Sequence, residues 1–341
     1  MNQTRADTFP HQRAGHCGSG ALRDLLEYHR LDFGDGPLSE GMVFGLAGGL
    51  GFFFAEFPGI APPFYLVGRT GDLERDIAEH IDAKLEVRES DDPQEGWRWV
   101  REEIDAGRPT MVWADIAELE YLRVRMSNTR HDIVVVDYDE DRGVAWIADN
   151  DRDEIQACSL RALAAARNSS GFPGPNRHAT FFYDWPTRLP APDVVLRRAL
   201  ARAVSNMRAS TVSVGDLPGG TGLDGVRRFA LSYPAWPEKF GEGLEQALAG
   251  LRIFIVKAGT AGAMFRSLHA DFLREMHEMI KAPALGTAAA IYDELAEAWR
   301  TLGRHAAQGE HAAGIPIVED IHRMEASGVE AMDALLMEAL L

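Results

Sequence analysis

Residues 11–22, HQRAGHCGSGAL, mark the point where irregular chain gives way to a helix. Leucines recur at helical spacing behind this stretch, so we predict an amphipathic helix over 18–29 with one face suited to burial. Cys17 lies at the start of that helix, where the positive end of the helix dipole favours the thiolate, the nucleophilic form of cysteine. A lone cysteine is more often a small buried hydrophobe. A nucleophilic role for Cys17 therefore needs a base and an orienting acid elsewhere in the chain.

Two valine-rich runs joined by an acidic turn supply these groups. Residues 131–138 and 144–151 each predict a strand, and the segment DEDRG between them predicts a hairpin loop. If the turn is centred near residue 140 or 141, the pairing places His131 opposite Asp149 or Asp151. Directly opposed residues lie about 4.5–5.5 Å apart at Cβ. A carboxylate at that position can bond one imidazole nitrogen and leave the other nitrogen for a thiol.

The strand pattern narrows the choice of orienting acid without completing it. Asp132 is excluded because it projects to the face of the strand opposite His131, and Asp137 is too far along the strand. Asp149 and Asp151 share the required face, so both remain candidates. For an arbitrary His–Asp pair, the ordinary interpretation is an exposed salt link that contributes little to stability. The combination of a helix-start cysteine, a strand-start histidine and a strand-end aspartate favours catalysis instead.

This order of residues resembles that of the papain-like cysteine peptidases, and within them the bacteriocin-processing branch. A closer resemblance is to the family of butirosin biosynthesis protein H. The segments that carry it in the first half are 16–22 (HCGSGAL), 38–46 (LSEGMVFGL), 48–52, 107–115, 131–138 and 148–150. In the second half, residues 262–273 (GAMFRSLHADFL) resemble the helical domain associated with that family.

The resemblance implies a fold, an activity and residue roles. It implies an α+β class, with a papain-like catalytic domain over 1–188 followed by an all-α helical domain over 189–341. It implies transfer of an acyl group from a carrier-protein thioester to an amine acceptor such as an aminoglycoside. Cys17 is then the nucleophile, His131 the base and Asp149 the orienting acid. The donor is a phosphopantetheine thioester, and no separate cofactor is expected.

The oxyanion hole is the place where this chain departs from the pattern. The peptidases usually place a glutamine six residues before the cysteine, whereas here Gln12 lies five before it and His11 lies six before it. Gln12 and His16 are therefore weak candidates for the side-chain donor. The backbone N–H of Cys17 can also serve.

Bulk composition limits the partners. The 341 residues carry 35 Lys+Arg and 52 Asp+Glu, a net charge of −17, which argues against nucleic-acid binding. This acidity suits a cationic acceptor, whereas an acidic carrier protein would need a local basic patch. The arginines at 197, 198, 202, 227 and 228 are candidates for such a patch, although we interpret them first as solvated helix faces. No segment has the length and apolarity of a membrane span or the apolar core of a signal peptide, so we expect a cytoplasmic protein without membrane contact. A homo-oligomer remains open.

The remaining cysteine and histidines have simpler interpretations. Cys158 has no base nearby in sequence and is expected to be structural. His178 is a rival base, ranked below His131 because it lacks a paired acid. Cys, His and carboxylate spacing predicts no metal site. The aromatic run at 50–64 is interpreted as a core strand rather than the wall of an acyl tunnel.

The second half of the chain is dominated by helix formers after a proline-rich linker at 184–192. Its most loop-like segment is 214–222. The predicted helices lie near 193–208, 222–232, 237–257, 261–281, 287–306 and 317–339.

Two alternatives to acyl transfer stay open. A papain-like peptidase or amidase, hydrolysing an amide or thioester, would use the same three residues with water as the acceptor. A non-catalytic binding scaffold would have an unreactive Cys17.

Overall fold

The computed structural model describes residues 5–57, 59, 61–209, 213–214, 217–258 and 260–337. These form two compact units, a first unit of Met1–Glu40 with Ile81–Leu189 and a second unit of Gly41–His80 with Pro190–Leu341. The boundary at 189/190 lies within the predicted proline-rich linker. Residues 41–80 belong to the second unit, which differs from the continuous domain over 1–188 that the sequence suggested.

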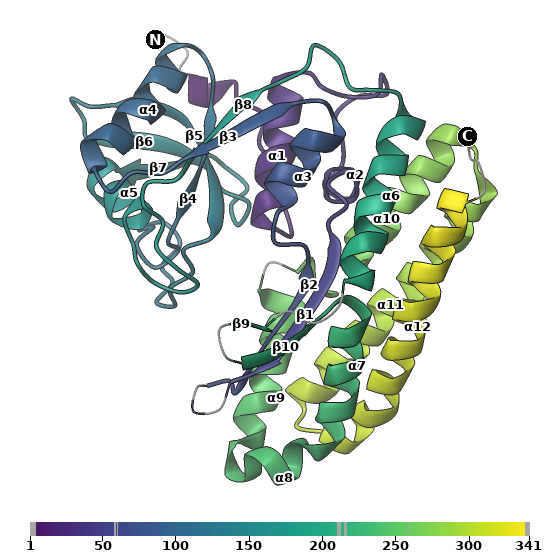
Figure 1. Cartoon of the computed structure of the whole chain (residues 1–341). Helices are drawn as coiled ribbons and strands as arrows, with labels where there is room; N and C mark the ends of the chain where they lie inside the picture. The colour runs from purple at the N-terminus through teal and green to yellow at the C-terminus, as the bar shows by residue number, and fades with distance from the viewer. Residues whose placement is uncertain are drawn as a thin grey trace. The chain divides into compact units, whose positions relative to one another are not determined.

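The first unit is built on a six-stranded antiparallel sheet in the order β3-β8-β4-β5-β6-β7 (Figure 1). Its strands are β3 (Lys84–Arg88), β4 (Thr110–Ala114), β5 (His131–Asp139), β6 (Val144–Ala148), β7 (Gln156–Ser159) and β8 (Thr180–Asp184). Its helices are η1 (Arg5–Asp7), α1 (Cys17–Tyr28), α4 (Pro93–Asp105) and α5 (Leu160–Arg167).

The two faces of this sheet carry separate cores because side chains alternate along each strand. Val134 and Val136 of β5 pack with Ala21 and Leu25 of α1 on one face. Ile133 and Val135 of the same strand belong to the core on the other face, together with residues of α4 and α5. The valine run of β5 is therefore buried on both sides, which explains why it lacks polar alternation. Because α1 packs on β5, the first residue of the helix lies near the start of the strand, where Sγ of Cys17 is 3.5 Å from Oδ2 of Asp132.

The all-α second domain expected from the sequence is not what the structure shows: the second unit is mainly helical but also contains strands. It contains a four-stranded sheet in the order β2-β1-β10-β9, made of β1 (Leu50–Glu56), β2 (Phe64–Arg69), β10 (Leu217–Thr221) and β9 (Ser213–Val214). The α-helices are α2 (Glu40–Leu46, whose first residue belongs to the first unit), α3 (Leu73–His80), α6 (Pro192–Arg208), α7 (Gly222–Ser232), α8 (Trp236–Phe240), α9 (Leu244–Arg252), α10 (Arg266–Ile280), α11 (Pro283–Ala307) and α12 (His311–Met337). Short helical turns are η2 (Tyr233–Ala235), η3 (Gly241–Gly243) and η4 (Ile253–Lys257).

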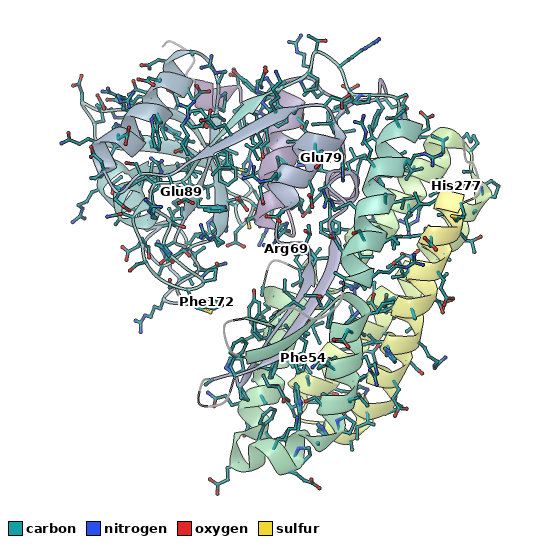
Figure 2. The ribbon with its side chains drawn as sticks, in the orientation of Figure 1. Phe54, Arg69, Glu79, Glu89, Phe172 and His277 are labelled. Atoms are coloured by element: carbon teal, nitrogen blue, oxygen red, sulfur yellow. The ribbon has the colours of Figure 1, made fainter. Side chains whose placement is uncertain are left out.

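The first part of the aromatic run at 50–64 is a core strand, as predicted, since residues 50–56 form β1; residues 58 and 60 of the run lie outside the described residues. Phe54 of β1, labelled in Figure 2, is buried, and its ring lies 5.4 Å from that of Phe229 on α7. Phe52 lies 5.9 Å from Trp299 of α11 between ring centroids. These contacts with α7 and α11 place β1 in the core of the second unit. Aromatic pairs at such spacing stabilise the core beyond the area that they bury.

The predicted helices of the second half correspond closely to α6, α7, α10, α11 and α12, whereas the predicted 237–257 helix is divided among α8, η3, α9 and η4. The segment expected to be a loop instead forms β10, which pairs with β1 from Phe53↔Thr221 to Ala55↔Gly219. Residues 215 and 216 of that segment, and 338 and 339 of the last predicted helix, lie outside the described residues. Among the helices that are described, none has the length and apolarity to cross a membrane.

Candidate active site

Cys17 is the first residue of α1, and the loop before it is held tightly. The N–H groups of Gly15 and His16 donate to the two carboxylate oxygens of Glu40, at 2.8 and 2.9 Å. At the next turn, a Cβ on Gly20 would lie 2.6 Å from the Cβ of Ala14, so only glycine permits this close approach of loop and helix. The thiol is therefore positioned by the backbone of a rigid helix start.

His131, the first residue of β5, is oriented by a carboxylate. Its Nε2 donates a hydrogen bond to Oδ2 of Asp149 at 2.9 Å, and both side chains are buried. A proton held on Nε2 leaves Nδ1 as the nitrogen available to a thiol, and His131 is also hydrogen-bonded to Cys17. The structure thus brings together the three residues that the sequence predicted, Cys17, His131 and Asp149.

Asp149 reaches His131 because the β5–β6 ladder ends before it. The last paired residues on this side are Val134 and Ala148, so Asp149 leaves the strand and begins a turn, in which its Oδ1 accepts the N–H of Asp151 at 3.0 Å. Its Oδ2 also accepts the hydroxyl of Tyr121 at 2.8 Å. The carboxylate of Asp149 is therefore held by the turn and by the Tyr121 hydroxyl as well as by His131.

The carboxylate of Asp151, the rival orienting acid, lies at the surface and engages arginines. Its carboxylate pairs with Arg152 at 2.6 Å and lies 3.7 Å from Arg13, and about half of the side chain is exposed. It makes its ion pairs at the surface, and only its backbone N–H supports Asp149.

The charges at the site favour a thiolate–imidazolium pair. Burial raises the pKa of Cys17, but the positive charge of His16 and hydrogen bonds from His131 and His16 outweigh it and bring the pKa well below its ordinary value. Burial lowers the pKa of His131, yet the charge and hydrogen bond of Asp149, with the Cys17 thiolate, raise it well above the ordinary value. Burial also opposes ionisation of Asp149, but His131 lowers its pKa overall. The pattern is that of an activated nucleophile.

His16 is part of this arrangement rather than a surface residue. It is the N-cap of α1 and is buried, and its Nδ1 accepts the N–H of Ser19 at 3.2 Å. Its Nδ1 is engaged by Ser19, so Nε2 is the ring nitrogen that can donate to the Cys17 sulfur.

Sequence reasoning missed one carboxylate at the site. Asp132 does project to the face of β5 opposite His131, as predicted, but that is the face on which α1 packs. Its Oδ2 lies 3.5 Å from the Sγ of Cys17, and the residue is 2 % exposed. The alternation rule that excluded Asp132 as a partner of His131 could have identified it as a neighbour of the helix.

The segment before the cysteine does not supply the glutamine found in the peptidases. Gln12 is exposed, and its backbone carbonyl accepts a hydrogen bond from Arg23. His11 is bound through both ring nitrogens, Nδ1 to Asp24 at 2.6 Å and Nε2 to the Arg152 carbonyl at 3.1 Å. Both partners of His11 are acceptors, so its ring has no N–H left for an oxyanion.

The remaining candidates lie away from the thiol. His178 packs against Gly96 of α4, on the sheet face opposite α1, and burial with the nearby Arg167 charge lowers its pKa to about 4. Cys158 is buried in the core on that same face, where burial raises its pKa to about 12. No cluster of His, Cys, Asp or Glu suited to a metal ion occurs in the part of the chain that the structure describes.

Two family models match the chain, and the three residues of the candidate site fall within the first of them. The family model described as butirosin biosynthesis protein H, N-terminal, matches residues 16–150, a span that contains Cys17, His131 and Asp149. A second model, described as a domain of unknown function (DUF4872), matches residues 161–335. A search of the curated proteins finds no match to the chain. Together the two models span most of the sequence, and the chain belongs to the butirosin biosynthesis protein H family, with its N-terminal domain followed by the associated C-terminal domain.

Proposed function

We propose that the protein is a cysteine-dependent acyltransferase that moves an acyl group from a thioester to an amine by way of an S-acyl enzyme. The observation that carries the proposal is the set Cys17–His131–Asp149, in which a thiol at a helix start is hydrogen-bonded to a histidine oriented by a buried carboxylate. We further propose a papain-like arrangement for the first unit. Its support is a helix that begins with the cysteine and packs on an antiparallel sheet whose strand β5 begins with the histidine.

In the first half-reaction, the Cys17 thiolate attacks the carbonyl carbon of the thioester. A new C–S bond forms, and the negative charge moves to the carbonyl oxygen at the start of α1. There the N–H of Cys17 and the positive end of the helix dipole stabilise it. Collapse of the adduct breaks the C–S bond to the donor, and the departing thiolate takes the proton from His131. The free energy of the imidazolium is lowered throughout by Asp149.

In the second half-reaction, the neutral amine attacks the acyl-enzyme. The N–C bond forms, the C–S bond breaks, and its electron pair returns to Sγ of Cys17. His131 accepts the proton that the amine nitrogen loses, which restores the thiolate–imidazolium pair. Water at the same position would give the free acid, so the fold alone does not choose between transfer and hydrolysis.

We propose that an acidic carrier protein presents the donor, and that it docks on the loop between β4 and β5. Arg123 and Arg125 are exposed there, alternating with the exposed apolar side chains of Val124 and Met126. The loop is tied to the catalytic residues through Tyr121, which bonds Asp149. A basic and apolar surface on the loop that carries Tyr121, in a chain of net charge −17, complements an acidic partner.

Product analysis tests the reaction type. The wild type and Cys17→Ala are incubated with a small acyl thioester, with and without a primary amine, and the amide and free acid are quantified. The proposal predicts amide formation by wild type, none by Cys17→Ala, and unchanged amide formation by the matched variant Cys158→Ala. Free acid as the sole wild-type product, even at high amine concentration, would favour the hydrolase instead.

A further inference from the structure

Tyr121 shares one oxygen of Asp149 with the catalytic base. Its hydroxyl donates to Oδ2 at 2.8 Å, and Nε2 of His131 donates to the same oxygen at 2.9 Å. The other oxygen, Oδ1, accepts the N–H of Asp151 at 3.0 Å. The carboxylate that orients His131 therefore divides its negative charge among three donors, and one of them is a side chain that the steps described above do not use.

The position of Tyr121 is fixed by its surroundings. Its ring packs against the core that lies on the sheet face opposite α1, and its neighbours Leu119 and Leu122 are buried in that core. Its backbone carbonyl accepts a hydrogen bond from Arg152 at 2.7 Å. Burial and the charge of Asp149 raise the pKa of Tyr121 well above its ordinary value. The hydroxyl therefore keeps its proton and serves as a donor to Asp149.

The hydroxyl matters most after Cys17 has been acylated. In the free enzyme both Asp149 and the Cys17 thiolate favour the protonated form of His131. Acylation removes the thiolate charge, and the departing donor takes the proton of His131, so the ring is left neutral. Attack by the amine needs that neutral ring, because Nδ1 must accept the proton that the nitrogen loses. A proton taken up from solvent instead would block the base, and Asp149 is the group that favours such uptake.

A second donor on Oδ2 opposes the imidazolium. A hydrogen bond to a carboxylate stabilises its charged form, which makes the carboxylate a weaker acceptor for other donors. Burial raises the pKa of Asp149, whereas His131, the N–H of Asp151 and the Tyr121 hydroxyl lower it. The hydroxyl proton also points at the oxygen that His131 binds, where it disfavours a further positive charge. Tyr121 thus weakens the hold of Asp149 on a protonated ring.

Other charges border this arrangement without binding the carboxylate of Asp149. Among the described residues, only Tyr121 and His131 donate a side-chain hydrogen bond to it. The surrounding titratable and charged groups are His16 and Cys17 of α1, Asp132 of β5, Arg152 of the turn after β6 and Cys158 of β7. Removing the Tyr121 hydroxyl changes none of these charges, so its effect on His131 can be measured by itself.

We propose that Tyr121 is a positioning residue that shares Oδ2 of Asp149 with His131, so that the imidazole stays neutral in the acyl-enzyme and can accept the proton of the attacking amine. This inference rests on the proposed function and deepens it by assigning a residue that regulates the second half-reaction. In that step the amine nitrogen forms the N–C bond and its proton moves to Nδ1 of His131. The C–S bond breaks, and its electron pair returns to Sγ of Cys17. Tyr121 keeps its own proton throughout.

The test follows discharge of the preformed acyl-enzyme as a function of pH. Cys17 is acylated with a small thioester, excess thioester is removed, and methoxyamine is added as the nucleophile. Methoxyamine is almost entirely neutral above about pH 6, so the profile reports the ionisation of His131. Tyr121→Phe removes only the hydroxyl. The matched control is Tyr138→Phe, which loses a hydroxyl that donates to Asp105 at the surface.

The expected result is a shift of the profile rather than a uniform loss. In Tyr121→Phe the midpoint of discharge should move upward by about 0.5–1 pH unit, because a hydrogen bond that opposed the imidazolium is gone. Discharge below the midpoint then slows by about three- to tenfold, while the plateau at higher pH stays within about twofold of wild type. Tyr138→Phe should follow the wild-type profile.

Alkylation of the unacylated enzyme by iodoacetamide separates this role from a structural one. The acid limb for Cys17 should be unchanged in Tyr121→Phe, because His131 is protonated on both sides of that limb. A limb moved to higher pH, or a loss of discharge that is equal at every pH, would mean that the hydroxyl only holds Asp149 in place, and would overturn the inference.

The remaining outcomes distinguish the inference from the proposed function. An unchanged discharge profile in Tyr121→Phe, or a midpoint moved downward, would overturn the inference alone, since wild type would still form and discharge an acyl-enzyme. A wild type that takes no acyl group from any thioester would overturn the proposed function and the inference together.

Discussion

The 2.9 Å hydrogen bond from Nε2 of His131 to Oδ2 of Asp149 determines which ring nitrogen of the imidazole is left for Cys17. With its proton held on Nε2, the ring presents Nδ1 to the thiol. The same carboxylate accepts the hydroxyl of Tyr121 and the N–H of Asp151, so it is fixed independently of the histidine. The orientation of the base is thus built into the turn that follows β6.

Replacing Asp149 by Asn should remove the charge that stabilises the imidazolium while keeping the shape of the side chain. We expect kcat/KM for acyl transfer to fall by about 100-fold or more, because the pKa of His131 loses its main support. Steady-state kinetics of Asp149→Asn and of the matched variant Asp151→Asn measure the effect. Asp151→Asn should stay within about threefold of wild type, and a larger loss in Asp151→Asn than in Asp149→Asn would reverse the assignment.

The two cysteines should react with alkylating agents in different pH ranges, because the pKa of Cys17 is lowered and that of Cys158 is raised. The pKa of Cys17 is lowered and that of His131 is raised, so the thiolate–imidazolium pair persists between the two values. Alkylation of Cys17 by iodoacetamide should stay fast well below the ordinary thiol pKa and fall only in more acidic solution, as the thiolate is protonated. Acyl transfer should also fall on the alkaline side, where His131 loses its proton. Cys158, whose pKa is raised to about 12, should remain unmodified in the folded protein.

His16→Asn provides the control for that profile, since asparagine is a good helix N-cap but carries no positive charge. Its acid limb should move to higher pH while the unfolding temperature stays near that of wild type. An unchanged profile in His16→Asn would mean that His16 does not contribute to the low thiol pKa.

Charge reversal on the β4–β5 loop should affect only a donor presented by a protein. Arg123→Glu with Arg125→Glu is expected to raise KM for a carrier-bound acyl thioester by about tenfold or more at low salt, because electrostatic steering is lost. KM for a small free thioester should be unchanged. The matched variant Arg197→Glu, on α6, should leave both values unchanged, and an equal rise in KM there would argue against a docking surface on the loop.

The second unit contains a buried ion pair on which its stability should depend. Nε of Arg266 lies 2.8 Å from Oε1 of Glu325, both side chains are fully buried, and Trp299 donates to the same oxygen. Arg266→Met should lower the free energy of unfolding by about 3–5 kcal/mol, since it leaves an unpaired buried carboxylate.

Urea unfolding of the full chain measures this loss. Arg208→Ala, which removes a partly exposed pair with Asp333, should cost less than about 1 kcal/mol. The double variant Arg266→Met with Glu325→Leu should recover only part of the lost stability, because the carbonyls of Gly51, Gly68 and Met264 still lose the Arg266 donor. Equal costs for Arg266→Met and Arg208→Ala would contradict the account of the buried pair.

The sequence predicted those parts of the molecule that depend on local pattern. The helix at Cys17, the β5–β6 hairpin and most helices of the second half follow from periodicity and from their proline and glycine boundaries. Non-local pairing was not predictable in this way. The glycine-rich segment at 217–221 becomes β10 because β1, more than 160 residues earlier, offers it a partner, and the same pairing places β1 in the second unit.

The candidate site shows the same division. The His131–carboxylate pairing was predictable from the hairpin, but the choice of Asp149 depended on where the ladder ends, which pairing with β5 and the turn at Asp151 decide. Strand alternation correctly excluded Asp132 as the partner of His131. It did not reveal Asp132 as a neighbour of Cys17, because the packing of α1 on that face of β5 is a tertiary contact.

The intact mass of the protein after incubation with acyl thioesters tests the central claim most directly. The account predicts that wild type and Cys158→Ala each gain the mass of one acyl group, that added amine removes it, and that Cys17→Ala gains none. No gain by wild type with any donor, or the same gain by Cys17→Ala, would contradict covalent catalysis at Cys17.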